Sequence, residues 1–252
     1  MDNTLKFSGK AENYVKARPD YPNKLFDFLK LNYGINKKSV FADIGAGTGI
    51  FTKKLLEYGC SVFAVEPNSD MRKALKAALG KNNNLTIVEG SDKSTKLSDN
   101  SVDFVCAAQA FHWFDADLFK KECNRILKPD GFVILVWNTR KSDSKIVRCN
   151  AEVCKKYCPE FTGFSGGKQS SHEKTDQFFG GNYKLVKFQN DLEYDKDKFI
   201  SRMLSASYSL TENDKNYSEY IKALNEFFNK YKSNDGILYL PNETLAYIGK
   251  IN

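Results

Sequence analysis

The run DIGAGTG from Asp43 to Gly49 constrains the fold more than any other part of the chain. The apolar residues 39–42 before it predict a buried strand, and residues 50–58 after it predict a helix. Glycine lets the backbone approach a ligand where a side chain would clash. A strand that turns through alternating glycines into a helix is therefore typical of nucleotide-binding turns. The G-x-G-x-G spacing departs from the G-x-G-x-x-G of dinucleotide-binding folds, so it favours adenosine with an amino-acid tail over a pyrophosphate.

An acidic residue follows the next predicted strand. Residues 61–65 are predicted to form a second buried strand, and Glu66 ends it. A carboxylate about 20 residues after the glycine turn is well placed to accept hydrogen bonds from both hydroxyls of a ribose. An exposed strand-end carboxylate without a ligand is the alternative. A helix is expected to begin at Asn68 or Ser69 and to end at Gly80.

Strand and helix patterns alternate from residue 39 to residue 139, which predicts a parallel sheet with helices on both faces. Residues 1–38 are expected to form a helical N-terminal cap whose helix begins at Pro22. Residues 140–180 show little periodicity beyond a short helix near 144–157, and we interpret them as a mobile lid or a loosely packed insertion. The other expected elements are strands at 85–88, 102–107, 132–137 and 183–188, helices at 119–127, 196–206 and 213–232, and a terminal strand or hairpin at 237–240 and 245–248.

Four segments occur in order: ADIGAGTG at 42–49, VEP at 65–67, a stretch at 89–115 that contains AFHWFD, and RILKPDGFVILVW at 125–137. Together they resemble the class I S-adenosylmethionine-dependent methyltransferases, and among these the small-molecule subgroup with a type 11 methyltransferase domain. The resemblance implies an α/β fold with a Rossmann-like, doubly wound, seven-stranded sheet, mostly parallel with its last strand antiparallel. It also implies a helical N-terminal cap and a C-terminal helical insertion.

We expect three regions on this basis: the cap at 1–38, a cofactor-binding α/β core at 39–139, and a variable part at 140–252 that completes the sheet and the acceptor pocket. The implied enzyme transfers a methyl group from its cofactor, S-adenosyl-L-methionine, to a small-molecule acceptor. A carboxylate or another anionic metabolite is one such acceptor.

Ligands of an open α/β sheet lie beyond the carboxyl ends of its strands. Together with the resemblance, this rule gives the expected cofactor-binding residues Arg18, Asp43, Gly45, Gly47, Gly49, Glu66, Met71, Ser91, Asp92 and Gln109. Asp43 either orders the turn by accepting backbone N–H groups or lies near the cofactor's ammonium. Met71 either packs on the adenosine or belongs to the core, and Arg18 either clamps the cofactor carboxylate or packs on the surface. Many relatives carry a small residue, Ala and Glu where this chain has Ser-Asp-Lys from Ser91. Lys93 takes the place of the usual carboxylate, but the backbone N–H of Asp92 is still expected to bind a ring nitrogen of the adenine.

The aromatic run AFHWF from Ala110 to Phe114 follows the fourth predicted strand, where methyl donor and acceptor would meet. Aromatic faces attract a cation and exclude water, which suits a sulfonium. A buried helix start is the alternative. His112 is the candidate catalytic residue, as a general base for a phenol, alcohol or amine, or it only forms a hydrogen bond within the fold. The expected acceptor-binding residues are Tyr14, Tyr21, Phe111, Trp113, Asn138, Arg202, Ser205 and Tyr208.

Composition limits the partners. The net charge of +7 is carried mostly by scattered lysines, which is typical of solvated surface and compatible with an anionic acceptor. No apolar run approaches the roughly 20 residues that span a bilayer, and the N-terminus lacks a signal-peptide core, so we expect a cytoplasmic protein without a membrane partner. The six cysteines lack paired C-x-x-C spacing and only two histidines are present, so we expect reduced thiols and no metal.

Three other functions stay open. A nucleic-acid methyltransferase would carry a basic stripe or an Asn/Asp-Pro-Pro-aromatic run after the fourth strand, and the run that begins at Gln109 disfavours it. A non-catalytic S-adenosylmethionine-binding regulatory protein would bind the donor without turnover. The glycine spacing argues against a nicotinamide oxidoreductase. No motif specifies the acceptor atom or the oligomeric state.

Overall fold

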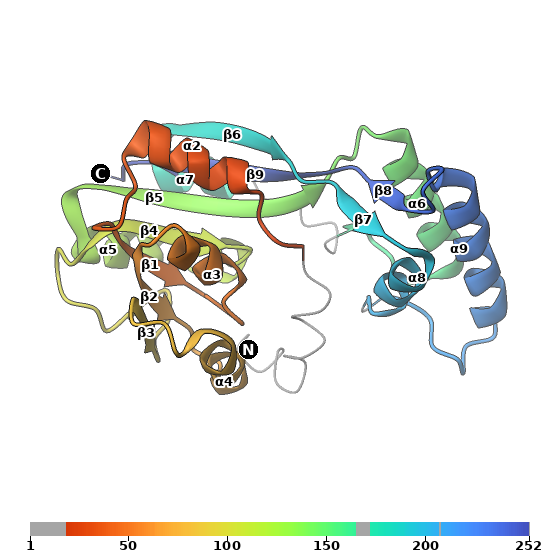
Figure 1. Cartoon of the computed structure of the whole chain (residues 1–252), viewed down its shortest axis with the longest axis horizontal. Coiled ribbons are helices and arrows are strands. Elements are labelled where there is room, and N and C mark those ends of the chain that lie inside the picture. The colour runs from red at the N-terminus through yellow and green to blue at the C-terminus, as the bar shows by residue number, and fades with distance from the viewer. Residues whose placement is uncertain (1–18, 165–171, 207, 252) are drawn as a thin grey trace. The chain divides into compact units, whose positions relative to one another are not determined.

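The computed structural model describes residues 19–164, 172–206 and 208–251 (Figure 1). The helices are α2 (Asn23–Tyr33), α3 (Ile50–Glu57), α4 (Ser69–Leu79), α5 (Ala116–Ile126), α6 (Lys145–Tyr157), α7 (His172–Phe179), α8 (Lys196–Leu204), α9 (Tyr217–Tyr231) and the 3₁₀ helix η2 (Phe111–Trp113). The strands are β1 (Val40–Ile44), β2 (Ser61–Val65), β3 (Leu85–Val88), β4 (Val102–Ala108), β5 (Leu127–Arg140), β6 (Tyr183–Gln189), β7 (Leu192–Tyr194), β8 (Leu238–Leu240) and β9 (Asn242–Gly249). Within the described ranges, no helix combines the length and the apolar character that crossing a membrane requires.

Seven strands form one sheet in the order β3-β2-β1-β4-β5-β9-β6. β1 pairs in parallel with β2 and with β4, β2 pairs in parallel with β3, and β4 pairs in parallel with β5. The last strand, β9, runs antiparallel (Figure 1). The strand order reverses between β1 and β4, which is the point where open α/β sheets bind ligands. The predicted Rossmann-like fold class is therefore confirmed.

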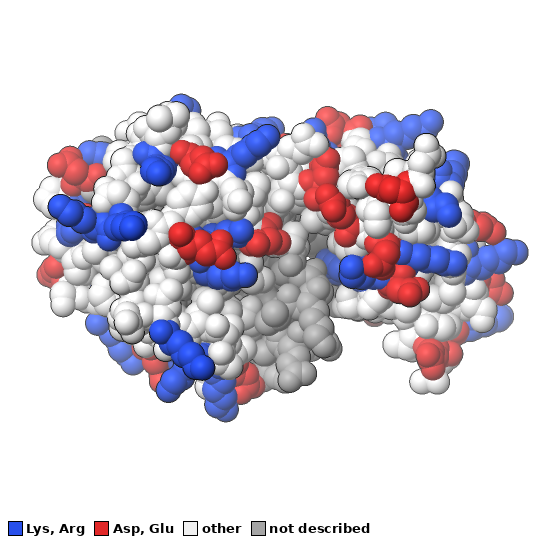
Figure 2. All heavy atoms as spheres, in the orientation of Figure 1, with Lys and Arg blue, Asp and Glu red and all other residues white. Residues whose placement is uncertain are grey.

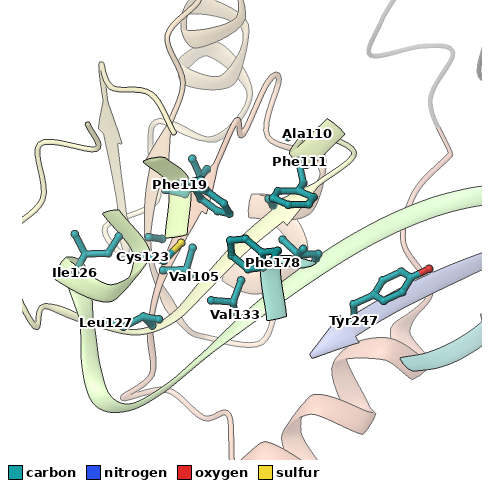
Figure 3. Packing of buried hydrophobic residues seen from close by; sticks show 14 of the residues in the cluster. Val105, Ala110, Phe111, Phe119, Cys123, Ile126, Leu127, Val133, Phe178 and Tyr247 are labelled. Carbon is teal, nitrogen blue, oxygen red and sulfur yellow. The ribbon is translucent and has the colours of Figure 1, made fainter. Parts of the chain in front are cut away.

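Alternate residues of β5 enter two different hydrophobic cores. Val133 and Leu135 belong to a cluster with α5 and α7, whereas Ile134 belongs to a cluster with α2 and α3. Figure 3 shows Phe119 of α5 and Phe178 of α7 in the first of these clusters, and their ring centroids lie 5.5 Å apart. Because successive side chains of a strand point to opposite faces, helices cover both faces of the sheet, as the doubly wound prediction requires.

Two helices begin at side-chain caps close to the carboxyl ends of the parallel strands. The side-chain oxygen of Asn68 accepts hydrogen bonds from the N–H groups of Asp70 and Met71, at 2.9 and 3.0 Å, and starts α4. The Asp115 carboxylate accepts one from the N–H of Leu118 at 3.2 Å and starts α5. Such caps satisfy backbone donors that a helix leaves unpaired at its first turn. They fix where each helix leaves the ligand-binding edge of the sheet.

The chain divides into two compact units. The first unit holds the described residues of 1–137, 170–188 and 244–252, and with them most of the seven-stranded sheet. The second unit holds the described residues of 138–169 and 189–243. In the second unit β7 and β8 form an antiparallel pair, and helices α6, α8 and α9 share a separate core around Phe199 and Tyr220.

Two elements differ from the sequence-based expectation. Helix α7 lies in the stretch 140–180 that we expected to be a lid or a loose insertion, and it places Phe178 in a core of the first unit. The segments 237–240 and 245–248 do not pair as a hairpin, because β8 pairs with β7 and β9 joins the large sheet. Pro241, which has no N–H to donate, separates the two strands.

All six cysteines lie in the described part of the chain, as free thiols. Those at positions 60, 106, 123, 154 and 158 are buried, whereas Cys149 on α6 is partly exposed. Among the described residues, no three or more His, Cys, Asp and Glu side chains gather where they could hold a metal ion.

Candidate functional site

The glycine turn joins β1 to α3 at the carboxyl end of the parallel strands. The N–H groups of Gly45 and Ala46 donate to the carbonyl oxygen of Val65, at 2.8 and 3.2 Å, so the end of β2 holds the start of the turn. The φ angles of Gly45, Gly47 and Gly49 are +71°, +58° and +87°, in the left-handed region that side chains disfavour. The predicted strand–turn–helix unit is present.

The three glycines meet different surroundings. A Cβ built at Gly45 would lie 2.8 Å from the Cβ of Ala110, and one at Gly49 would lie 3.0 Å from the Cγ of Leu75. Packing within the protein therefore requires both of these glycines. A Cβ at Gly47 would meet none of the described atoms within 4 Å. Of the three glycines, only Gly47 therefore has open space beside it among the described atoms, and ligand contact there stays a prediction.

Glu66 connects the two turns that follow β1 and β2. Its Oε2 accepts a hydrogen bond from the N–H of Gly47 at 2.9 Å, and its Oε1 accepts one from the N–H of Asn68 at 2.8 Å. The residue is only 7% exposed, and this burial raises the pKa of its carboxyl. A carboxylate offers about four acceptor positions, so these two bonds leave both oxygens able to accept from a ligand.

Asp43 lies beneath the glycine turn and is 1% exposed. Its Oδ2 accepts a hydrogen bond from the hydroxyl of Thr52 on α3 at 2.6 Å, and its Oδ1 accepts one from the thiol of Cys106 on β4 at 3.7 Å. Burial raises its pKa to about 6. These contacts join β1, α3 and β4 and fit the role of ordering the turn. Contact of Asp43 with a cofactor ammonium stays a prediction.

The predicted adenine-binding residues form a tight turn after β3. Ser91 and Ser94 exchange two backbone hydrogen bonds, at 3.0 and 3.3 Å. The carboxylate of Asp92 accepts a hydrogen bond from the N–H of Asp115 at 3.1 Å, and burial raises the pKa of Asp92. Asp92 therefore links this turn to the start of α5. Met71 is buried on α4 at 3% exposure.

The aromatic run after β4 divides between the core and the edge of the first unit. Gln109 leaves the strand with a φ of +56°, and its N–H donates to the carbonyl oxygen of Val136 at 2.8 Å. Phe111 is 1% exposed in the core that Figure 3 shows. His112 and Trp113 are partly exposed, with ring centroids 4.9 Å apart. Phe111 therefore packs in the core, whereas His112 and Trp113 are only partly buried.

Lys174 of α7 is a residue of this edge that was not predicted from the sequence. Its ammonium donates to the carbonyl oxygens of Phe111 and Phe114, at 3.1 and 2.6 Å, and lies 4.8 Å from the centroid of the Phe111 ring. Burial lowers the pKa of this lysine. Because its partners are backbone carbonyls about 60 positions earlier in the chain, no local pattern marks it. Lys174 holds both ends of η2.

The remaining predicted residues lie in the core of the first unit, in the second unit or outside the described residues. Tyr21 is buried in the core of the first unit, where its ring meets Phe51 edge-on with centroids 5.0 Å apart. Arg18 and Tyr14 lie outside the described residues. The acceptor-binding predictions Asn138, Arg202, Ser205 and Tyr208 all lie in the second unit.

Within the second unit, these residues make local contacts. The Oδ1 of Asn138 accepts a hydrogen bond from the Nδ2 of Asn190 at 3.2 Å. On α8, the guanidinium of Arg202 lies 3.4 Å from the hydroxyl of Ser205, which donates to the Arg202 carbonyl oxygen at 2.8 Å. The described cofactor-binding predictions thus all lie in the first unit, whereas the acceptor-binding predictions divide between the two units, with Tyr21, Phe111 and Trp113 in the first.

Comparison with known proteins identifies similar chains. A family model described as a methyltransferase domain matches residues 42–135. An uncharacterized methyltransferase-like protein of Schizosaccharomyces pombe is 30% identical over 210 residues, which cover 83% of this chain and 81% of that protein. An uncharacterized methyltransferase of Mycobacterium tuberculosis is 40% identical over 139 residues, 55% of this chain and 54% of that protein. A solved structure from Anaeromyxobacter dehalogenans, assigned as a type II methyltransferase, shares the fold with a TM-score of 0.68 at 20% identity, over 92% of this chain and 97% of that one.

Proposed function

The chain belongs to the class I S-adenosylmethionine-dependent methyltransferases, and from that membership we propose that it transfers a methyl group from S-adenosylmethionine to a small-molecule acceptor. The acceptor class we favour is a carboxylate or another anionic metabolite. The observation that carries the proposal is the bridge from Glu66 to the N–H groups of Gly47 and Asn68. It joins the glycine turn to the carboxylate at the end of the neighbouring strand.

The residues of this edge fit the proposed cofactor. Gly47 leaves room where a side chain would stand, so a ligand can reach the backbone of the turn. Both oxygens of Glu66 can each accept a further hydrogen bond, which suits the two hydroxyls of a ribose. The carboxylate of Asp43 places negative charge beneath the turn once it ionises above about pH 6, which suits a ligand that carries a cationic group.

S-adenosylmethionine supplies an activated methyl group on a sulfonium when it is bound. The protein's part is to orient the reactants and exclude water, and such positioning can lower a barrier by roughly 7–11 kcal/mol. The rings of His112 and Trp113 offer apolar surface at this edge. We assign His112 the role of receiving a proton if the acceptor is a phenol, an alcohol or an amine, whereas a carboxylate acceptor needs no base.

The charge distribution on one face of the molecule supports a small anion over a nucleic acid. On the face drawn in Figure 2, Lys and Arg side chains are interspersed with Asp and Glu. A nucleic-acid surface would gather basic side chains along one stripe. The net charge of +7 would still attract a small anionic acceptor in solution.

A turnover assay tests the proposal. The purified chain is incubated with methyl-labelled S-adenosylmethionine and a panel of mono- and dicarboxylic acids, phenols and amines, and S-adenosylhomocysteine is measured. Release that depends on an acid in the panel is the expected result. Calorimetric binding of the donor without turnover on any acceptor would favour the regulatory protein instead, and no binding of either donor or product would remove the proposal.

A further inference from the structure

In the second unit, Arg140 has a buried guanidinium nitrogen and no acidic partner among the described residues. Arg140 ends β5, and its Nη1 is buried without a hydrogen-bond partner among the described residues. Its guanidinium carbon lies 4.0 Å from the centroid of the Phe164 ring, so one face of the group stacks on an aromatic side chain. Nη1 therefore stays without an acceptor in the described structure.

The groups that act electrostatically on Arg140 are the phenols of Tyr194 and Tyr208, the thiol of Cys154 and a second cation, Arg202. None of these is a carboxylate. Burial and the neighbouring cation both lower the pKa of Arg140. An uncompensated buried charge is strongly destabilising, so proteins normally pair such a group with an acid. Here the described residues provide no such acid.

The neighbouring side chains suit an anion. Tyr208 is held by its edge-on contact with Phe161, with centroids 4.8 Å apart, and burial raises the pKa of its hydroxyl, which therefore stays protonated and can donate. Arg202 is partly exposed, so a ligand can reach it from solvent. Two guanidinium groups and a phenol are donors that match the geometry of a carboxylate or a phosphate.

We propose that Arg140 and Arg202 form an oxyanion-binding site in the second unit, which takes a carboxylate or phosphate group of a small molecule. The second unit thus selects its ligand by negative charge. Identifying this ligand with the methyl acceptor rests on the function proposed above, whereas the binding site itself stands on the contacts of Arg140. Stacking on Phe164 does not by itself account for an arginine at position 140, because an apolar side chain could pack against that ring without burying a charge.

Calorimetry with defined probes tests the site. Citrate and inorganic phosphate are titrated separately into the full chain in a buffer without other oxyanions, and into the variants Arg140→Met, Arg202→Met and Arg148→Met. Arg148 lies on α6 of the same unit and donates to the carbonyl oxygen of Asp143, so it serves as the matched control. Saturable binding of at least one probe is expected, with affinity at least about tenfold lower in the first two variants and unchanged in the control.

Thermal unfolding without any probe separates loss of the site from loss of the fold. Arg140→Met is expected to unfold at no lower a temperature than the wild-type chain, because it removes an unpaired buried charge.

Binding of citrate alone would identify a carboxylate ligand, and binding of phosphate alone would identify a phosphate ligand. Absence of saturable binding to the wild-type chain, or wild-type affinity in both Arg140→Met and Arg202→Met, would overturn the inference.

Titration of S-adenosylhomocysteine into the same preparations separates the two proposals. If it binds and neither oxyanion does, only the oxyanion site is wrong. If an oxyanion binds and S-adenosylhomocysteine does not, the methyl-transfer proposal is wrong and the site remains.

Discussion

At the scale of single residues, Glu66 matters because one side chain fixes two loops. Its oxygens hold the N–H groups of Gly47 and Asn68, so both the turn and the start of α4 are set before a ligand arrives. Pre-organised acceptors lose little freedom when they bind. This carboxylate is therefore the side chain whose loss should weaken cofactor binding most directly.

We expect Glu66→Ala to weaken S-adenosylhomocysteine binding by about 1–3 kcal/mol, because charge-assisted hydrogen bonds to the ribose are lost. Isothermal titration calorimetry measures the change. Glu57→Ala, which removes an exposed carboxylate from α3, is the control. An unchanged dissociation constant in Glu66→Ala would show that the ribose assignment is wrong.

The glycines predict a contrast between stability and binding. Gly45→Ala should lower the free energy of unfolding by about 2–4 kcal/mol, since it combines a left-handed φ with overpacking against Ala110. Gly47→Ala should cost only about 1–2 kcal/mol of stability, from its φ alone, yet reduce cofactor affinity. Urea unfolding and calorimetry measure the two effects. Wild-type affinity in Gly47→Ala would place the ligand elsewhere.

Asp43 predicts a pH dependence of stability. Because burial raises its pKa to about 6, the folded chain keeps a proton that the unfolded chain releases near pH 4. The folded state binds more protons in that window, so the free energy of unfolding should fall between about pH 4 and about pH 6 and then level off. Urea unfolding of Asp43→Asn across this range should show a shallower slope. Parallel curves for variant and wild type would contradict the assignment.

At the scale of elements, η2 depends on a helix from a distant part of the chain. We expect Lys174→Met to lower the free energy of unfolding by about 1–2 kcal/mol, because two hydrogen bonds from a charged donor to the carbonyls of Phe111 and Phe114 are lost. It should also reduce turnover, because His112 lies within η2. Urea unfolding and the S-adenosylhomocysteine assay measure these effects.

Lys187→Met, on the exposed side of β6, is the control for that experiment. Retained wild-type stability and turnover in Lys174→Met would mean that η2 keeps its conformation without the lysine.

The elements that the sequence predicts well are those set by local chemistry. β1 and β2 are short buried apolar runs bounded by turns, and Glu66 stands at a fixed spacing from the glycines. β5 begins at Leu127 although Pro129 and Gly131 suggested a later start, because pairing with β4 extends it. Contacts such as those of Lys174, Arg140 and Asp92 depend on distant backbone or on burial, and no spacing in the sequence encodes them.

At the scale of the whole molecule, the division into two units predicts where each ligand acts. Hydrogen exchange measured by mass spectrometry should show S-adenosylhomocysteine protecting the segment 43–49 and η2 of the first unit. Citrate should protect the segment around Arg140 and α8 of the second unit. Protection follows because a ligand that binds only the folded state stabilises what it contacts. Protection of the second unit alone by S-adenosylhomocysteine would contradict the cofactor assignment.

The burial of five of the six cysteines has a practical consequence. Only Cys149, on α6 of the second unit, is partly exposed, so we expect a maleimide to react there first. Burial raises the pKa of Cys60, Cys154 and Cys158, which slows their reaction further. The wild-type chain therefore accepts a single fluorophore without mutagenesis. Its emission would follow events in the second unit while the first unit stays unlabelled.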